Sequence, residues 1–522
     1  MSNNRNVSDE LSWKIIETYF KGQHLTRCIR HQLESYNDFA TTQIQKTIDM
    51  FNPVTIHSEQ DYDEESKKYK LELIITFTNF NIYRPQIHEN NGATKIMYPQ
   101  EARMRNFTYA SAMTLDMDIK IIHRSGENLQ QCETHYKKLP KIHIGKLPIM
   151  VKSEICVLTQ NSHLNADITG ECRFDAGGYF IINGSEKTVI AQERAAENRV
   201  MCFNIKKNNN KWSWAAEIKS IPDFKCISPK QIKVVICTKN NGFGHPIQIQ
   251  IPRIKQPIPL FILFRALGIN EDEKICSFII LNTKAKKMKR MLYALKASII
   301  EANEYLTKED ALNYIVSYAM YTPINMDKET GERKKKEFTV NVLNNDLFPH
   351  CPTEKQKIYF LGYMANKLLS TSFGWRKIDD RDSYLNKRID LTGTLLNNLF
   401  RNYFNKLVKD MSKQIVREIN NGSWRSTENF LNIINRTNIY KIVKSTTIEN
   451  GIKRALATGD FGVKNSNSNK VGVAQVLNRL TYVSSLSHLR RVNTPIDKSG
   501  KLIPPRKLTV QVGDIFVQLR LQ

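Results

Sequence analysis

The apolar residues of this 522-residue chain change their spacing several times along the sequence, and each spacing suits one type of secondary structure. In residues 10–50 they recur every three or four positions, as on one face of a helix, whereas residues 66–125 alternate apolar and polar side chains, as strands do. Residues 395–419 return to helical spacing, with an apolar residue every four positions. These patterns predict an α+β fold, and the length predicts two to four domains.

The segment GGYFIINGSEKTVIAQE, residues 177–193, carries a strong hairpin signal. Asn183 and Gly184 separate two apolar runs, and both residue types tolerate the positive φ angles that a type I′ turn requires. The sequence therefore predicts a β-hairpin with its turn at Asn183-Gly184.

Three further segments carry local predictions. A strand-rich section is expected to open with residues 207–218, KNNNKWSWAAEI, where the composition becomes polar before the strands begin. Residues 284–300 predict a helix with an apolar stripe and a lysine-rich start, and the stripe is Met288, Leu292, Leu295 and Ile299. ERKKKEF, residues 332–338, is expected to be an exposed charged loop.

Positive charge is concentrated near the end of the chain. The net charge is +26, and residues 441–508 hold thirteen Lys or Arg against three acidic residues. Because a protein that neutralises phosphates releases their counterions, a surplus of this size favours a polyanionic partner. A lysine-rich translation of an AT-rich genome also accounts for the total charge. The local concentration of charge is therefore better evidence for a polyanionic partner than the total is.

The sequence proposes no catalytic or metal site of its own. Nine cysteines occur without a CxxC pair, which favours free thiols, and the usual phosphate-loop, metalloprotease and hydrolase motifs are absent. His488 lies near Asp497 without a suitably spaced nucleophile. The acidic cluster Asp379, Asp380 and Asp382 is surrounded by Lys and Arg, which favours a salt-bridged surface over a cation site.

Two basic, loop-rich stretches remain: residues 464–470 and 496–507. Between them a helical stretch ends in Arg490-Arg491, and paired guanidinium groups suit phosphates because they donate in a fixed fork. From the residues alone, the sequence predicts a basic surface that binds a nucleic-acid backbone.

Segments in order along the chain resemble the N-terminal part of the second-largest, beta-type subunit of multisubunit DNA-directed RNA polymerase. The resemblance spans roughly residues 13–508 and is closer to eukaryotic nuclear and large-DNA-virus versions than to the bacterial one. The Asn, Ile and Lys bias is typical of an AT-rich, virus-like source. Among the segments are QLESYNDF (32–39), PQEARMRNFTYA (99–110), GGYFIINGSEKTVIAQER (177–194), DDRDSYLNKRIDLTGTLLNNLFR (379–401) and ALATGDFG to IPPRKL (455–508).

The resemblance implies an α+β multidomain architecture made of the polymerase protrusion, lobe and partial fork. The lobe is expected as an insertion between two parts of the protrusion. The implied parts are an N-terminal helical segment (1–35), protrusion (36–206 and 390–459), lobe (207–389), partial fork (460–508) and an unassigned tail (509–522).

In this family the fork lies beside the active centre and carries two loops near the DNA–RNA hybrid. Residues 464–470 match the first loop and residues 497–501 the second. The resemblance therefore implies contacts with template and transcript phosphates, and no catalytic or metal-binding residue in this chain. The nucleic-acid-binding residues that it implies are Lys464, Lys470, Gln475, Asn478, Arg479, Arg490, Arg491, Lys498 and Lys501.

The sequence departs from the family after residue 508, where the family continues with a segment of the type HxTHWGxxCPxETPEG and this chain reads TVQVGDIFVQLRLQ. The catalytic Mg²⁺ of the family belongs to the other large subunit, so this chain is expected to bind no cofactor and not to polymerise RNA alone. The expected partners are the largest subunit, the remaining C-terminal part of the second subunit, the DNA template and the nascent RNA. No membrane is expected.

Two other hypotheses stay open: a non-catalytic nucleic-acid- or polymerase-binding protein derived from this fold, and a truncated gene product. The tail 509–522 is either a strand or intronic or frameshifted translation. The first residues, MSNNRNVSDELSWK, lack the apolar run of a signal peptide. The expected location is intracellular, in the nucleus or cytoplasm, or in a virion if the source is viral.

Overall fold

The chain forms two compact units in a computed structural model. Unit 1 comprises Met1–Glu193 and Ile389–Gln522, and unit 2 comprises Arg194–Arg388. The chain leaves unit 1 within β11 (Ala191–Ala195) and returns within β17 (Lys387–Asp390). The structure describes residues 9–21, 25–58, 62–63, 68–126, 129–205, 211–222, 229–281, 288–322, 328–381, 383–422, 424, 429–462 and 471–494.

The two units do not by themselves test the names protrusion, lobe and fork, which stay predictions. Residues 194–204 belong to unit 2 because β12 (Met201–Asn204) pairs with β13 (Trp212–Ser220) of that unit. The tail 509–522 lies outside the described residues.

Unit 1 is built on an antiparallel sheet with the strand order β1-β4-β7-β8. Along β4 every second side chain is buried from Leu71 to Phe77, as the alternation in the sequence predicts. The strands expected in 66–125 are thereby confirmed, with a short helix, α4 (Pro99–Met104), between two of them. The sheet strands are β1 (Val54–His57), β4 (Leu71–Ile82), β7 (Ala110–Ser125) and β8 (Gln131–Pro148).

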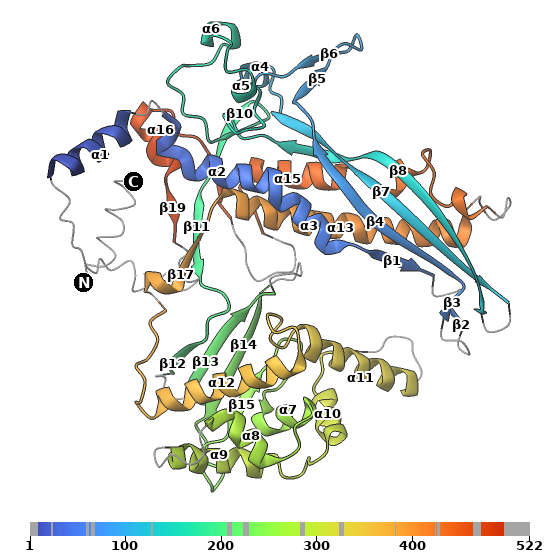
Figure 1. Cartoon of the computed structure of the whole chain (residues 1–522), viewed down its shortest axis with the longest axis vertical. Helices are drawn as coiled ribbons and strands as arrows, with labels where there is room; N and C mark the ends of the chain where they lie inside the picture. Colours follow the sequence, from blue (N-terminus) through green and yellow to red (C-terminus); the bar gives the residue numbers. More distant parts are fainter. Residues whose placement is uncertain are drawn as a thin grey trace. The chain divides into compact units, whose positions relative to one another are not determined.

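Four helices lie along this sheet and enclose the core of unit 1 with it (Figure 1). They are α2 (Arg30–Asp38), α3 (Ile44–Phe51), α13 (Thr392–Asn421) and α15 (Thr446–Thr458). Helix α13 contains the helix predicted for 395–419 and packs on α2, α3 and α15. It buries Leu395, Leu399, Leu407 and Met411 of the predicted stripe, and Tyr403 is partly buried against the same core.

The remaining elements of unit 1 are short, apart from the first helix. Within the described residues of either unit, no helix is both long enough and apolar enough to cross a bilayer. The helices are α1 (Asp9–Lys21), η1 (Leu25–Ile29), η2 (Phe39–Gln43), α5 (Val157–Gln160), α6 (Ala166–Thr169), η8 (Phe430–Asn432), α14 (Ile439–Ile442) and α16 (Tyr482–Leu489). The strands are β2 (Tyr62–Asp63), β3 (Lys68–Tyr69), β5 (Gln86–His88), β6 (Thr94–Ile96), β9 (Phe180–Ile182), β10 (Ser185–Val189), β18 (Ala474–Val476) and β19 (Val492–Asn493).

The predicted hairpin is confirmed. Strands β9 and β10 pair antiparallel, with Ser185 opposite Ile182. Asn183 has φ +49° and Gly184 has φ +79°, the two positive angles of the expected type I′ turn. A Cβ on Gly184 would lie 2.5 Å from Asn106 Oδ1, so the turn is also packed closely against the end of α4.

Unit 2 packs helices on a five-stranded antiparallel sheet whose strands follow in sequence order, β12 to β16. This confirms the strand-rich section expected from residue 207. The other strands are β14 (Lys230–Cys237), β15 (Ile247–Gln250) and β16 (Ile258–Pro259). The helices are α7 (Leu260–Ala266), α8 (Asp272–Ile280), α9 (Lys289–Glu301), α10 (Lys308–Ser317), α11 (Lys328–Asn345), α12 (Glu354–Ser372) and η6 (Tyr384–Asn386).

Two local predictions in unit 2 need correction. Residues 332–338 are not a loop but part of α11, because the apolar Val342 and Leu343 that follow are buried and the charged side chains lie on the outer side of the same helix. The helix predicted for 284–300 is confirmed as α9, but its stripe is shifted. Met291 and Leu295 are buried, whereas Leu292 is 36% exposed.

We expect Gly184→Val to destabilise unit 1 by about 1–3 kcal/mol, because a β-branched residue is strained at positive φ and its Cβ would collide with Asn106. Thermal or chemical denaturation of the full chain measures this change. Gly92→Val is the matched control, since Gly92 has φ +81° but open space around the Cβ position. An unchanged melting temperature for Gly184→Val would contradict the predicted turn. Equal losses of stability in the two variants would exclude a contribution from the collision with Asn106.

Candidate nucleic-acid interface

Segments that carry the family resemblance meet around strand β10. This strand is the middle one of a three-stranded sheet, β18-β10-β9, so the hairpin pairs directly with the region predicted as the fork. Lys187 lies opposite Val476, and Val189 lies opposite Ala474. The backbone N–H of Leu477 also donates to the carbonyl of Glu186 at 3.0 Å. Strands β10 and β18, which lie far apart in the sequence, are therefore paired in a defined register.

Arg479 follows β18 and makes an ion pair with Glu186 of β10. Its Nε donates to Glu186 Oε2 at 2.7 Å and its Nη2 donates to Oε1 at 3.1 Å, a two-pronged geometry that suits guanidinium and carboxylate. Its Nη1 lies 3.5 Å from Asp175 Oδ1, and its guanidinium lies over the ring of Tyr179 at 4.9 Å. The positive charge of Arg479 is thus balanced by carboxylates of the protein itself.

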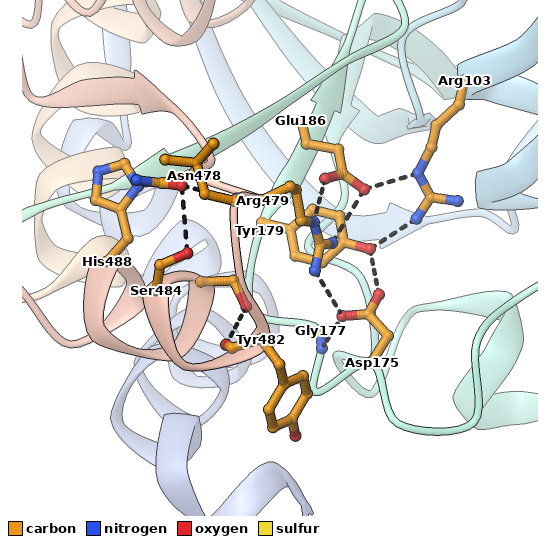
Figure 2. A network of polar contacts seen from close by, with 12 residues as sticks. Arg103, Asp175, Gly177, Tyr179, Glu186, Asn478, Arg479, Tyr482, Ser484 and His488 are labelled. Carbon is orange, nitrogen blue, oxygen red and sulfur yellow. Dashed lines mark hydrogen bonds and ion pairs between the residues drawn. The ribbon is translucent and has the colours of Figure 1, made fainter.

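Arg103 of α4 approaches the same glutamate from the other side (Figure 2). Its Nε donates to Glu186 Oε1 at 2.9 Å, its Nη1 to Glu171 at 2.8 Å and its Nη2 to the Tyr179 hydroxyl at 2.6 Å. The Tyr179 hydroxyl in turn donates to Asp175. Because Arg103 and Glu186 are each only 18% exposed, this side of the network is largely shielded from solvent.

The electrostatics of the network follow from this partial burial. Burial disfavours the charged form of Arg479, but the hydrogen bond to Glu186 and the charge of Asp175 outweigh it and raise the pKa. For Glu171 burial is the larger effect and raises the pKa of the carboxyl, although Arg103 opposes it. Burial, together with the charge of Asp175, raises the pKa of Tyr179.

His488 of α16 forms hydrogen bonds that hold the connection between β18 and α16 in place. It is 4% exposed, its Nδ1 accepts from the backbone N–H of Asn478 at 3.1 Å, and its Nε2 lies 3.0 Å from Gln475 Oε1. A ring whose Nδ1 accepts and whose Nε2 donates is neutral, with its proton on Nε2. Burial, and then the charge of Arg491, lower the pKa of His488, which favours the same neutral form.

Gln475 and Asn478 are therefore held in place by protein groups. The Gln475 amide donates to the carbonyl of Gly472 at 3.1 Å while its oxygen faces His488. Asn478 Oδ1 accepts from the backbone N–H of Leu480 at 2.9 Å (Figure 2 shows its contact with Ser484). Thr481 and Ser484 then form a capping box that starts α16.

Arg490 and Arg491 lie at the end of α16, as the sequence predicts for a helix ending there. Arg490 is the C-terminal cap, and its Nη1 donates to the carbonyl of Cys28 at 2.9 Å. Arg491 is exposed. The preceding carbonyl, that of Leu489, accepts from Gln32 at 3.0 Å, which fixes the end of α16 on α2.

The structure thus separates the predicted site residues into groups. Gln475 and Asn478 lie together around His488, Arg490 and Arg491 lie together at the end of α16, and Arg479 lies in the ion network. Lys464, Lys470, Lys498 and Lys501 lie outside the described residues. Nucleic-acid contact by any of the nine stays a prediction.

Sequence reasoning missed the partners of Arg479. Arg103, Tyr179 and Glu186 all lie in the segments that carry the resemblance, so those segments indicate the region of the partners but not the pairing itself. The sequence raises His488 only as a catalytic group, and its surroundings give it a structural role instead.

The described residues contain no group of three or more His, Cys, Asp or Glu side chains that could hold a metal ion. Asp379 of the acidic cluster pairs with Lys367 at 3.0 Å and accepts from the backbone N–H of Cys202 at 2.9 Å, as expected for a salt-bridged position. All eight cysteines that the structure describes are free, and five of them, including Cys156 and Cys202, are buried.

Comparison with known proteins gives two family matches. Residues 27–450 match the family described as RNA polymerase beta subunit, and residues 475–512 match the family described as RNA polymerase Rpb2, domain 3. Together these matches cover all of unit 2 and most of both parts of unit 1.

Individual relatives share about a third of their residues with the chain. It is 34% identical over 512 residues to DNA-directed RNA polymerase II subunit 2 of Arabidopsis thaliana and 36% over 518 residues to subunit RPB2 of Schizosaccharomyces pombe. These alignments cover 96% and 97% of this chain but only 41% of each relative. It is 30% identical over 515 residues to DNA-directed RNA polymerase subunit Rpo2N of Methanothermobacter thermautotrophicus (strain Winter), covering 97% of this chain and 91% of that relative.

We expect Glu186 and Arg479 to be energetically coupled, because their ion pair is partly shielded from water. A double-mutant cycle with Glu186→Gln and Arg479→Gln, measured by chemical denaturation, should give a coupling energy of about 1 kcal/mol. The exposed pair Glu271–Lys274 is the matched control and should give less than about 0.5 kcal/mol. Additive effects of the two substitutions would contradict an energetic coupling between Glu186 and Arg479.

We expect His488 to make the protein less stable in acid. Because its pKa is lowered in the folded protein, the unfolded chain binds a proton at higher pH than the folded chain does. This contribution is complete above the ordinary pKa of about 6.5 and is lost as the pH falls below it, by at most about 1.4 kcal/mol per pH unit.

The measurement is the difference in unfolding free energy between the wild type and His488→Gln. This difference should shrink from pH 7.5 to 5.5, whereas His245→Gln, at an exposed histidine, should leave the pH dependence unchanged. A difference that stays constant over this range would contradict the neutral, buried state of His488.

Proposed function

The chain belongs to the RNA polymerase beta-subunit family, of which it represents the N-terminal part, and we propose that it works as this part of the second-largest subunit in a multisubunit DNA-directed RNA polymerase. The observation that carries the proposal is the match to the archaeal relative, of which the chain covers 91%. A polypeptide of this extent is by itself named a polymerase subunit in archaea. In the proposed complex, further polypeptide supplies what the chain lacks relative to its eukaryotic relatives.

The proposed task of the chain is to support nucleic acid rather than to carry out chemistry. The largest subunit holds the catalytic Mg²⁺, and the present chain contributes scaffold and contacts with template and transcript. The proposed contacts include Lys464, Lys470, Gln475, Asn478, Lys498 and Lys501. The complex works inside the cell, in the nucleus or cytoplasm.

Among the described candidates, the end of α16 supports this role best. Arg491 is exposed, and its guanidinium has no hydrogen bond or ion pair to another described residue, whereas Arg490 beside it is held by the carbonyl of Cys28. Arg479 is better suited to positioning, since its guanidinium already binds Glu186. The ion network and His488 would then hold α16 in the orientation that presents Arg491.

Purification of the chain from its native source tests the proposal. We expect a largest-subunit chain and polypeptide corresponding to the remaining part of the second subunit to co-purify, and the assembly to extend RNA on a DNA–RNA scaffold with Mg²⁺. The intact mass shows whether that remainder is a separate chain or continuous with this one. If the chain co-purifies with polymerase subunits in an inactive complex, the result would instead support a derived, non-catalytic binding protein. If no polymerase subunit co-purifies, both the proposed function and this alternative would be contradicted.

Within the same assembly, Arg490→Ala with Arg491→Ala should weaken scaffold binding. The slope of log affinity against log salt should fall by about one unit for each phosphate that is no longer bound, so by about two if both arginines bind phosphate. Lys239→Ala with Lys308→Ala removes the same charge from exposed positions of unit 2 and is the control. Equal slopes for the two double variants would contradict phosphate binding by these arginines.

A further inference from the structure

Helix α13 has an outer side that remains exposed when the helix packs in unit 1. The inner side of this thirty-residue helix is apolar and buried, and its buried residues include Phe404, Leu407, Met411, Ile415 and Ile419. After Phe400, the exposed residues of the helix are few. They are Lys406, Lys409, Lys413, Arg417 and Asn421.

Four of these residues, Lys406, Lys409, Lys413 and Arg417, form a line along the helix, which we call the α13 stripe. Their spacing of three, four and four residues keeps them within about 80° of one another around the helix axis, since each residue turns the helix by about 100°. At about 1.5 Å per residue the stripe is about 16 Å long. The result is a straight row of cations on a rigid element.

The charges of the stripe are not balanced by the part of the protein that the structure describes. None of the four side chains has an ion pair or hydrogen bond to another described residue, in contrast to Arg103 and Arg479. Like charges three or four residues apart on a helix destabilise it by about 0.2–0.5 kcal/mol per pair. A polyanion lying on the stripe would relieve this repulsion between like charges.

We propose that the α13 stripe binds the phosphate backbone of duplex DNA, without sequence preference, at a place separate from the end of α16. This inference rests on the proposed function, which supplies DNA as a partner. Phosphate contacts need charge but no base-reading groups, and the exposed positions of the stripe offer cations only. A protein partner would need apolar anchors, and the exposed residues of α13 after Phe400 include none.

The form of the stripe favours a duplex over a single strand. Single-stranded nucleic acids are held by aromatic side chains on which their bases stack, and no aromatic residue is exposed on this side of α13. A linear row of cations on a helix instead matches the dense, regular line of phosphates on a stiff duplex.

The test is the salt dependence of binding to a 30-base-pair duplex of arbitrary sequence, measured by fluorescence anisotropy with the full chain in its native assembly. The stripe variant combines K406Q, K409Q, K413Q and R417Q. We expect it to lower the slope of log affinity against log salt by about two to four units, at about 0.9 for each phosphate that is no longer neutralised. Circular dichroism should show an unchanged fold, because all four positions are exposed.

Two controls make the result specific. The scattered variant combines K46Q, K239Q, K308Q and K355Q, and it removes the same number of charges from exposed positions that form no line. It should lower the slope by clearly less than the stripe variant does. The charge-preserving variant combines K406R, K409R, K413R and R417K, and it should keep the wild-type slope.

Each remaining outcome overturns the inference. Equal slopes for the stripe and scattered variants would show that only net charge matters. A stripe variant that binds duplex normally but loses a co-purifying chain would assign the stripe to an acidic protein, and loss confined to single-stranded probes would assign it to a single strand. RNA extension by the assembly distinguishes these results from a failure of the proposed function. If the assembly extends RNA but the stripe variant keeps the wild-type salt slope, only the inference about the stripe is rejected.

Discussion

The carboxylate of Glu186 joins parts of unit 1 that are distant in sequence. It accepts hydrogen bonds from Arg103, 83 residues earlier, and from Arg479, 293 residues later. Because Glu186 is 18% exposed, its charge needs these partners, and loss of either would leave a partly buried carboxylate less well compensated. The same residue is held through its backbone, whose carbonyl accepts from Leu477. The position of the connection leading to α16 depends on this double attachment.

The attachment also fixes the strand register. Successive side chains of a strand point to opposite faces, so a shift of one residue between β10 and β18 would turn Glu186 away from Arg479. His488 adds a second constraint, since it bonds both to Gln475 on β18 and to the backbone of Asn478 beyond it. Ion pairing and the buried histidine thus define one orientation of α16, and with it the direction in which its terminal arginines lie.

Local signals in the sequence predicted local structure well, and their failures have a physical reason. The Asn183-Gly184 turn and the long helix α13 follow from turn chemistry and a four-residue period, which act within a few residues. The run 332–338 was misassigned because charge density indicates exposure but not backbone conformation. The pairing of Arg479 with Glu186 was not predictable, since no periodicity links residues 293 positions apart. The candidate site was therefore predicted as a region, while the partners of its side chains were not.

Net charge alone is a poor guide to where a polyanion binds, because a cation is available to phosphate only where the protein has not already paired it. The region 441–508 holds thirteen Lys or Arg against three acidic residues, yet Arg479 within it is bound by Glu186 and Arg490 by a backbone carbonyl. Helix α13 lies outside that region, and its four stripe cations have no partner among the described residues. A long helix must place polar residues on its outer side, but solvation alone does not require that consecutive exposed positions be cationic. The contrast between paired and available cations, rather than their total, supports the proposal that α13 binds DNA in addition to the contacts proposed for the end of α16.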